Sequence, residues 1–200
     1  MTYPPQNFDH LLGLAGFSNQ LLQNHFKLYQ GYVTNTNKLL DILMQMVKDG
    51  KTTTPEFAEL KRRFGWEFNG MRLHELYFGN MSKTKKSLPE SSSLYKKMVD
   101  VFGSGQMCES AFVATGSMRG IGWVIMNYDP VSKRLFHTWV NEHDVGHLVS
   151  TVPLLILDVF EHAFMLDYGL NRAEYIKAFI TAIDWEVVGK RFEKAEKFIL

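Results

Sequence analysis

A carboxylate and an imidazole follow the most apolar run of this sequence. Residues 153–157 (PLLIL) predict a buried β-strand, and Asp158 and His162 come after it. A charged carboxylate left unpaired at the end of a buried strand costs free energy. A metal ion would satisfy both side chains, and the alternative interpretation is a buried hydrogen bond between them. This segment by itself does not choose between the two.

Two further histidines lie on otherwise apolar faces of predicted helices. Steps of three and four residues keep one side of a helix, so His25 shares a face with Leu21, and His74 shares one with Met71 and Phe78. A single histidine in such a place is usually a hydrogen-bonded core residue. Three imidazoles and one carboxylate would instead form a ligand set that suits iron, manganese or zinc better than calcium or magnesium.

The composition excludes several classes of protein. The chain has 200 residues, of which 46% are hydrophobic and 22% charged, as in ordinary globular proteins rather than disordered or fibrous ones. A net charge of +1 gives little basis for binding nucleic acid. The single cysteine, Cys108, excludes a disulfide framework and a cysteine-rich metal site. Without a leader or a long apolar run, we expect a cytoplasmic protein with neither nucleic acid nor membrane as partner.

The first part of the sequence predicts two long helices. Ser18 is placed to cap a helix that runs to about Lys48. Thr54 and Pro55 then supply a capping hydroxyl and a proline at the first helical position of a helix that continues to about Phe78. Because the connection is short, the two helices are expected to form an antiparallel hairpin.

The second part predicts a mixture of strands and helices. A polar stretch at 82–93 is typical of a linker, and residues 94–102 predict an amphipathic helix. Short runs rich in β-branched and aromatic residues predict strands at 111–114, 123–127, 135–140 and 154–159. A helical pattern that begins at Asn171 continues as far as Trp185.

These elements predict an α+β fold with two domains. Residues 1–84 would form the N-terminal long antiparallel helical hairpin. Residues 85–200 would form a C-terminal domain with a small antiparallel sheet of about three strands, flanked by helices. The candidate ligands come from both parts, so we expect the metal site between them.

Several short motifs occur along the chain in a particular order. They are GFS at 16–18 followed by His25, YVTNTN at 32–37, FNGMRLHELYF at 68–78, GIGW at 120–123, DVFEHAFMLDY at 158–168 and NRAEY at 171–175. Their order and spacing resemble the iron/manganese superoxide dismutases, whose C-terminal signature is Asp-x-Trp-Glu-His-Ala-Tyr-Tyr. The resemblance runs nearly from end to end of the chain.

The resemblance implies a metal-dependent enzyme of antioxidant defence. The implied ligands of one iron or manganese ion per chain are His25, His74, Asp158 and His162. In that family water or hydroxide is the fifth ligand, and the metal cycles between its +3 and +2 states as superoxide becomes dioxygen and hydrogen peroxide. The sequence leaves open whether iron, manganese or either supports activity.

The resemblance also implies roles for residues beside the metal. Tyr32 would lie near the substrate channel, and Trp123 would form a wall of the pocket. Most members hold the metal-bound solvent with a glutamine, either at the position of Gly70 or in the loop before the last strand. Gly70 has no side chain, so we expect His143 to make this contact, with Glu142 as the competitor if the loop is shifted by one residue.

Some positions depart from the family pattern. Phe78 and Phe160 stand where tryptophans usually surround the metal. Leu28 and Met165 replace a histidine and a tyrosine that normally bond across the dimer at the mouth of the channel. Replacement of both polar residues by apolar ones is physically consistent, because replacement of only one would leave the other as a buried polar group without a partner.

The family further implies a two-fold homodimer, in which Glu161 holds the imidazole of His162 of the partner subunit. A ligand imidazole needs its other N–H held, and a carboxylate does this well. Whether two dimers pair into a tetramer is left open.

Two other functions compete with dismutation. The apolar Leu28 and Met165 favour a metal-binding member with little dismutase activity, acting as a structural dimer or a metal store, whereas the complete ligand set and Tyr32 argue against it. A zinc hydrolase is a weaker interpretation, because His74 and Glu75 lack the second histidine of the HExxH motif.

The spacing between His25 and Tyr32 is one residue shorter than in the family. Seven steps nearly close two helical turns, whereas eight steps overshoot and need a local widening such as a π-bulge. We therefore predict an uninterrupted α-helix with both side chains directed at the metal pocket.

Overall fold

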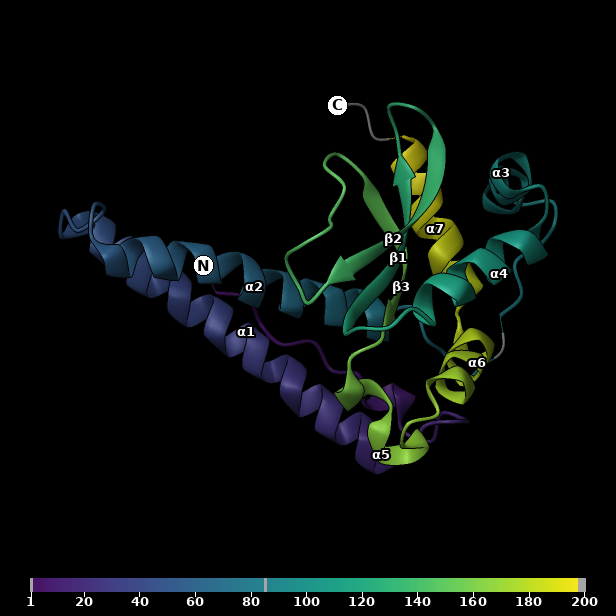
Figure 1. Ribbon diagram of the computed structural model, residues 1–200, viewed down its shortest axis with the longest axis horizontal. Coiled ribbons are helices and arrows are strands. Elements are labelled where there is room, and N and C mark those ends of the chain that lie inside the picture. Colours follow the sequence, from purple (N-terminus) through teal and green to yellow (C-terminus); the bar gives the residue numbers. More distant parts are fainter. Residues whose placement is uncertain (1, 85, 198–200) are drawn as a thin grey trace.

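The computed structural model describes residues 2–84 and 86–197 (Figure 1). Its elements are η1 (Asp9–Leu11), α1 (Asn19–Lys48), α2 (Pro55–Phe78), α3 (Ser93–Phe102), α4 (Gly105–Gly116), β1 (Gly122–Asp129), β2 (Arg134–Asn141), β3 (Val152–Asp158), η2 (Glu161–Ala163), α5 (Met165–Tyr168), α6 (Arg172–Ala182) and α7 (Trp185–Glu196). The predicted α+β fold is confirmed. The expected domain boundary falls at Lys85, which lies outside the described residues.

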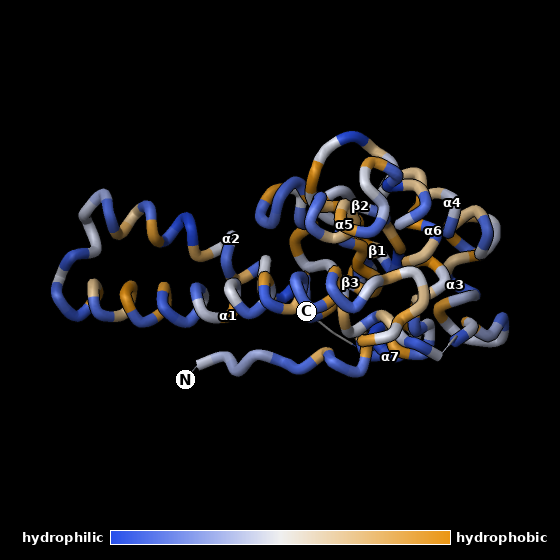
Figure 2. Tube along the Cα trace, turned by 90° about the horizontal axis from the view of Figure 1, so that it is seen from below, coloured by the Kyte–Doolittle hydropathy of each residue, from blue (hydrophilic) through white to orange (hydrophobic). Residues whose placement is uncertain are grey.

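The two long helices form the predicted hairpin. Ser18 Oγ accepts a hydrogen bond from the Leu21 amide, and Thr54 Oγ1 accepts one from the Phe57 amide, so each helix begins at the expected cap. In Figures 1 and 2, α1 and α2 project together as an arm, with hydrophilic residues predominating towards its tip. At the base of the arm α1 contacts η2 and α2 contacts β3. This base therefore meets the region that follows the apolar strand.

The sheet has three antiparallel strands in the order β2-β1-β3. The strands predicted at 123–127, 135–140 and 154–159 are confirmed, with small differences at their ends. The central strand, β1, is buried along nearly its whole length. In its register Trp123 pairs with Asp158, so the start of β1 and the end of β3 lie side by side.

The strand predicted at 111–114 is wrong, because these residues belong to α4. A run of four apolar residues is too short to distinguish a strand from a helix. Two other features decide for the helix. Ser104 Oγ caps it by accepting from the Met107 amide, and Cys108 and Phe112, four residues apart, are both buried on the face that packs against the sheet.

The helical pattern expected to include Trp185 is divided in the structure. Helix α6 ends at Ala182, and Ile183 is extended. Asp184 then caps α7 by accepting hydrogen bonds from the amides of Glu186 and Val187, so Trp185 begins a second helix. None of the helices within the described residues is long and apolar enough to cross a membrane.

Candidate metal centre

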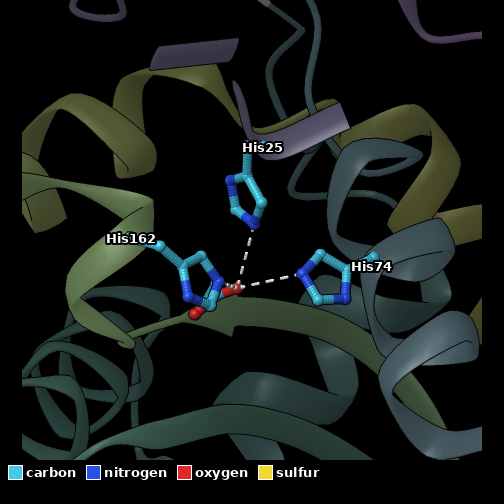
Figure 3. Close-up of side chains that lie close together, drawn as sticks. His25, His74 and His162 are labelled. Carbon is cyan, nitrogen blue, oxygen red and sulfur yellow. Dashed lines mark hydrogen bonds and ion pairs between the residues drawn. The ribbon is translucent and has the colours of Figure 1, made fainter. Parts of the chain in front are cut away.

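Four side chains from four separate elements converge at the base of the arm. His25 comes from α1, His74 from α2, Asp158 from the end of β3 and His162 from η2. One nitrogen or oxygen atom from each lies within 4.8 Å of the others. Figure 3 shows the three imidazoles directed at a single carboxylate oxygen. The tertiary structure thus brings together all four of the expected ligands.

The ligand atoms of the four side chains lie close together. Asp158 Oδ2 lies 3.2 Å from His25 Nε2, 3.3 Å from His162 Nε2 and 3.7 Å from His74 Nε2. His25, His74 and Asp158 are buried, and the side chain of His162 is 30% exposed. The Nε2 atoms of His25 and His74 have no hydrogen-bond partner within the described chain. Buried nitrogens without partners are costly, so this arrangement fits a bound cation.

The chain fixes which atom of each residue faces the centre. The Asp158 Oδ1 atom accepts from the Phe160 amide at 2.9 Å, which leaves Oδ2 for the three imidazoles. The Asp158 carbonyl accepts from the Tyr175 hydroxyl at 2.6 Å. His74 Nδ1 donates to the Gly70 carbonyl at 2.6 Å, so its Nε2 keeps the free lone pair.

The protonation states suit metal binding. Burial lowers the pKa of His25 and lowers that of His74 further, so both rings are neutral near pH 7. Burial by itself raises the pKa of Asp158, but the favourable interactions of the carboxylate with the neighbouring His162 and His25 imidazoles outweigh it and keep the carboxyl group ionised. Neutral imidazole and carboxylate are the forms that bind metal ions, and three nitrogens with one oxygen suit iron or manganese.

A hydrogen-bonded chain lies beside this cluster. The Trp123 indole N–H donates to His143 Nδ1 at 3.0 Å, and His143 Nε2 lies 2.7 Å from the Tyr32 hydroxyl. Burial lowers the pKa of His143 to about 4, so the ring is neutral. Since Nδ1 accepts from Trp123, Nε2 carries the proton and donates to Tyr32. The Tyr32 hydroxyl hydrogen is then free to donate elsewhere.

Comparison with known proteins decides the family. Residues 89–191 match the model of the C-terminal domain of iron/manganese superoxide dismutases. The superoxide dismutase (Fe) of Aquifex pyrophilus is 37% identical over 196 residues, covering 94% of this chain and 91% of the relative. The superoxide dismutase (Mn) of Haloarcula marismortui is 32% identical over 96% of this chain and 93% of its own.

The chain belongs to the iron/manganese superoxide dismutases. It is therefore a metal-dependent oxidoreductase with superoxide as its substrate, and the expected function is confirmed. The relatives support this function rather than that of a metal store. A cluster of three histidines and one aspartate in this chain suits one iron or manganese ion.

The first helix of this superoxide dismutase is uninterrupted, as its spacing predicted. Helix α1 is α-helical from Asn19 to Lys48, with no π-helical residue. His25 and Tyr32 both face the pocket, where the Tyr32 ring stacks on His74 at 5.2 Å between centroids.

Gly70 creates the space that Tyr32 occupies. A Cβ atom at Gly70 would lie 2.6 and 2.7 Å from two carbons of the Tyr32 ring. Gly70 therefore does two things: it provides no hydrogen-bonding side chain, and it leaves room for the Tyr32 ring, which any side chain at this position would displace. Burial raises the pKa of Tyr32 to about 12, so its hydroxyl is protonated at neutral pH.

Aromatic rings enclose the cluster on several sides. Phe78 is edge-on to His25 at 4.8 Å, and Trp123 is edge-on to His74 at 5.0 Å. Phe160 stacks on both His143 and His162. Phe78 and Phe160 therefore pack against the candidate ligands, and neither ring brings the N–H donor that a tryptophan would supply.

The structure favours His143 over Glu142 beside the pocket. His143 is fully buried against Tyr32 and Trp123. Glu142 takes a left-handed conformation with φ 53°, and its side chain makes no hydrogen bond within the described residues. His143, and not Glu142, is therefore the residue of this loop that contacts Tyr32 and Trp123.

Three expected residues lie outside the buried cluster. Glu161 is exposed, and its carboxylate has no hydrogen-bond partner in the part of the chain that the structure describes. Leu28 and Met165 are 36% and 40% exposed. Their predicted roles involve a second subunit.

Sequence reasoning missed several residues of the site. Trp66 is edge-on to His143 at 4.9 Å, and the Arg63 guanidinium lies over the Trp66 ring. Both precede Gly70 on α2, and their helical spacing was the available signal. Tyr175 was noticed as part of a motif, but its bond to the Asp158 carbonyl depends on the packing of α6. His147 had no signal beyond its residue type.

Proposed function

We propose that His25, His74, Asp158 and His162 bind one iron or manganese ion and that superoxide is dismutated there. The convergence of their four ligand atoms, two of them buried nitrogens without partners, carries this proposal. The ion supplies a one-electron couple, so that two superoxide ions and two protons yield dioxygen and hydrogen peroxide. The chain's own residues must therefore admit a small anion and deliver protons.

Tyr32 and His143 are suited to proton delivery. The Tyr32 hydroxyl keeps its proton at neutral pH, and it accepts from His143 Nε2 at 2.7 Å. We assign the donor in the pocket to Tyr32 and the alignment of that donor to His143, which Trp123 orients from its other side. Because both ring nitrogens of His143 are bonded within the chain, His143 would act on the solvent in the pocket through the Tyr32 hydroxyl, and not by the direct contact expected from the sequence.

The site draws on both predicted domains. His25 and His74 belong to 1–84, and Asp158 and His162 belong to 85–200. We propose that the ion joins the arm to the sheet region. The expected consequence is that its removal loosens this junction as well as ending activity.

A two-fold homodimer is the proposed assembly. Glu161 is exposed and has no hydrogen-bond partner among the described residues, and it lines a cavity of about 310 Å³ together with Met118, Met165 and Leu170. These apolar side chains are 49%, 40% and 91% exposed. In the proposed dimer Glu161 bonds to the partner's His162, and a tetramer of two such dimers remains the alternative.

Cytoplasmic location and the absence of nucleic-acid and membrane partners remain proposals. The net charge of +1 supports the proposal on nucleic acid, because it provides no excess of cations for phosphates. Cell fractionation and a binding assay with duplex DNA would test them.

The ligand assignment is tested by His162→Ala. This change should remove most of the metal and abolish superoxide consumption, because it removes one of the four proposed ligand side chains from a site that the chain builds around all four. Elemental analysis of the purified protein, together with a direct superoxide-decay assay, measures both effects. His10→Ala is the matched control, since His10 is exposed and lies in η1. Full iron or manganese occupancy in the His162 variant would refute the assignment.

A further inference from the structure

The connection between β2 and β3 carries His143 but has little regular structure. It covers residues 142–151 and is the long green loop beside the sheet in Figure 1. Glu142 and Ser150 have left-handed backbones, with φ 53° and 67°, and Val149 is 92% exposed. Neither a helix nor a strand therefore fixes the backbone at His143.

The ring of His143 nevertheless has to be held accurately. Its two nitrogens bond to Trp123 at 3.0 Å and to Tyr32 at 2.7 Å, and these partners lie on β1 and α1. Hydrogen bonds weaken steeply as distance and angle depart from the optimum. A loop that shifts at His143 would thus disturb the alignment of the Tyr32 hydroxyl.

His147 holds the peptide of His143. Its Nε2–H donates to the His143 carbonyl at 2.9 Å. Within the described residues that carbonyl has no other donor. Other hydrogen bonds of the loop do not involve the His143 peptide: the backbone pair between Asn141 and Val145 encloses the turn, the Glu142 amide donates to the Ile121 carbonyl at 3.5 Å, and Thr151 bonds to Leu148 and to the Asn127 side chain.

The surroundings of His147 leave room for substitution. Its ring lines a cavity of about 160 Å³, together with Arg72 and Leu73 of α2 and Asn127 of β1. A side chain of similar length can therefore replace the imidazole without a clash. A substitution at His147 can therefore remove its hydrogen bond to the His143 carbonyl without changing how the side chain packs.

We propose that His147 is a positioning residue for dismutation. By fixing the peptide of His143, it keeps the imidazole of His143 bonded to Trp123 and Tyr32 and so sets the direction of the Tyr32 hydroxyl in the pocket. This inference rests on the proposed roles of Tyr32 and His143.

A matched pair of variants of the metal-loaded enzyme tests the proposal. His147→Gln keeps a donor, because its amide nitrogen occupies the place of Nε2, whereas His147→Met keeps the length and removes the donor. Loss of one hydrogen bond should speed amide exchange in 142–151 roughly three- to tenfold in the Met variant. Its kcat should fall by a similar factor at unchanged metal content, and the Gln variant should stay within about twofold of the parent.

Val149→Ser is the control in the same loop, because this exposed side chain should leave exchange and kcat unchanged. Equal behaviour of the Met and Gln variants would overturn the proposal. If His147→Met does not fold, His147→Asn replaces it, since its amide is one bond too short to reach the carbonyl. Failure of the ligand assignment would appear instead as metal retained in His162→Ala, and the loop exchange in the matched pair would still test His147.

Discussion

The absence of a side chain at Gly70 determines where the Tyr32 ring can lie. Gly70 is unsubstituted because the Tyr32 ring occupies the volume of a Cβ atom, and that ring in turn stacks on His74. The hydroxyl at the other end of the ring reaches His143. One missing side chain on α2 is therefore linked to the position of a proton donor on α1.

Gly70→Ala should impair the site without removing a ligand. The new Cβ would lie 2.6 Å from the Tyr32 ring, so the ring must move, at a cost of about 1–3 kcal/mol in the free energy of unfolding. Superoxide consumption should fall while metal content is retained. Chemical denaturation and an activity assay measure the two effects.

Gly65→Ala is the matched control for this change. Gly65 lies in the same helix, and nothing lies within 4 Å of its added Cβ. Alanine there should stabilise the protein by up to about 1 kcal/mol and leave activity unchanged. Equal activities of the two alanine variants would show that Gly70 has no special role.

Among the elements, α6 supports the end of β3 by a chain of buried hydroxyls. Tyr175 of α6 donates to the Asp158 carbonyl at 2.6 Å, and Tyr77 of α2 lies 3.1 Å from the Tyr175 hydroxyl. Because Tyr175 gives its proton to Asp158, it accepts from Tyr77. Three elements thereby meet at the backbone of one proposed ligand.

Tyr175→Phe should destabilise the metal site more than Tyr77→Phe. The first change leaves the Asp158 carbonyl and the Tyr77 hydroxyl without their partners, whereas the second keeps the bond to Asp158. We expect a loss of about 1–3 kcal/mol for Tyr175→Phe and faster metal release to a chelator. Tyr77→Phe should release metal at nearly the rate of the parent, and the reverse order would contradict this account.

The packing of α3 and α4 on β2 contains a half-buried histidine, which lies outside the candidate metal centre. His137 of β2 stacks on Phe102 with 4.7 Å between centroids, and its Nε2 lies 3.6 Å from Cys108 Sγ. Burial lowers the pKa of His137 to about 4 from its ordinary 6.5. The unfolded chain therefore binds more protons than the folded one between pH 4 and 6.5, and stability falls as pH falls through this range.

His137→Phe should flatten the dependence of stability on pH. The change removes a contribution of about 1–3 kcal/mol that is lost between pH 6.5 and pH 4 in the parent. Denaturation at a series of pH values, with the variant and parent compared at each, isolates this term from the titration of other groups. Parallel curves for the two proteins would mean that His137 titrates normally.

The whole molecule combines an extended arm with a compact sheet region (Figure 1), and the four proposed ligands lie where the two meet. Exposed apolar side chains near Glu161, among them Met118, Met165 and Leu170, line the cavity of about 310 Å³. Exposed apolar patches bordered by charged groups are typical of surfaces that bind another protein. A second copy of the chain is the proposed occupant.

Glu161→Ala should weaken both the dimer and the retention of metal. Loss of the carboxylate would leave an imidazole unheld at the interface. Sedimentation at micromolar concentration and elemental analysis measure the two effects. Glu193→Ala is the control, because Glu193 is an exposed acid on α7. A fully metallated monomer in the parent protein would be incompatible with the proposed dimer.

The sequence by itself determined the local features of the fold. Ser18 and Thr54 marked the beginnings of both long helices, since a capping hydroxyl acts within three residues of its place in the chain. The spacing of His25 and Tyr32 was enough to predict a regular helix, because helical geometry fixes directions over two turns. The resemblance supplied the candidate ligands, which single motifs left ambiguous.

Only the tertiary structure decided how distant residues share one site. The run at 111–114 became helix through the cap at Ser104 and packing against the sheet, neither of which a four-residue pattern contains. The contact between Gly70 and Tyr32 and the bonds of His143 to Tyr32 and Trp123 depend on how segments far apart in the sequence are placed. Sequence periodicity indicates on which face of a helix or strand a side chain lies. The atoms that this side chain contacts depend on how the whole chain packs.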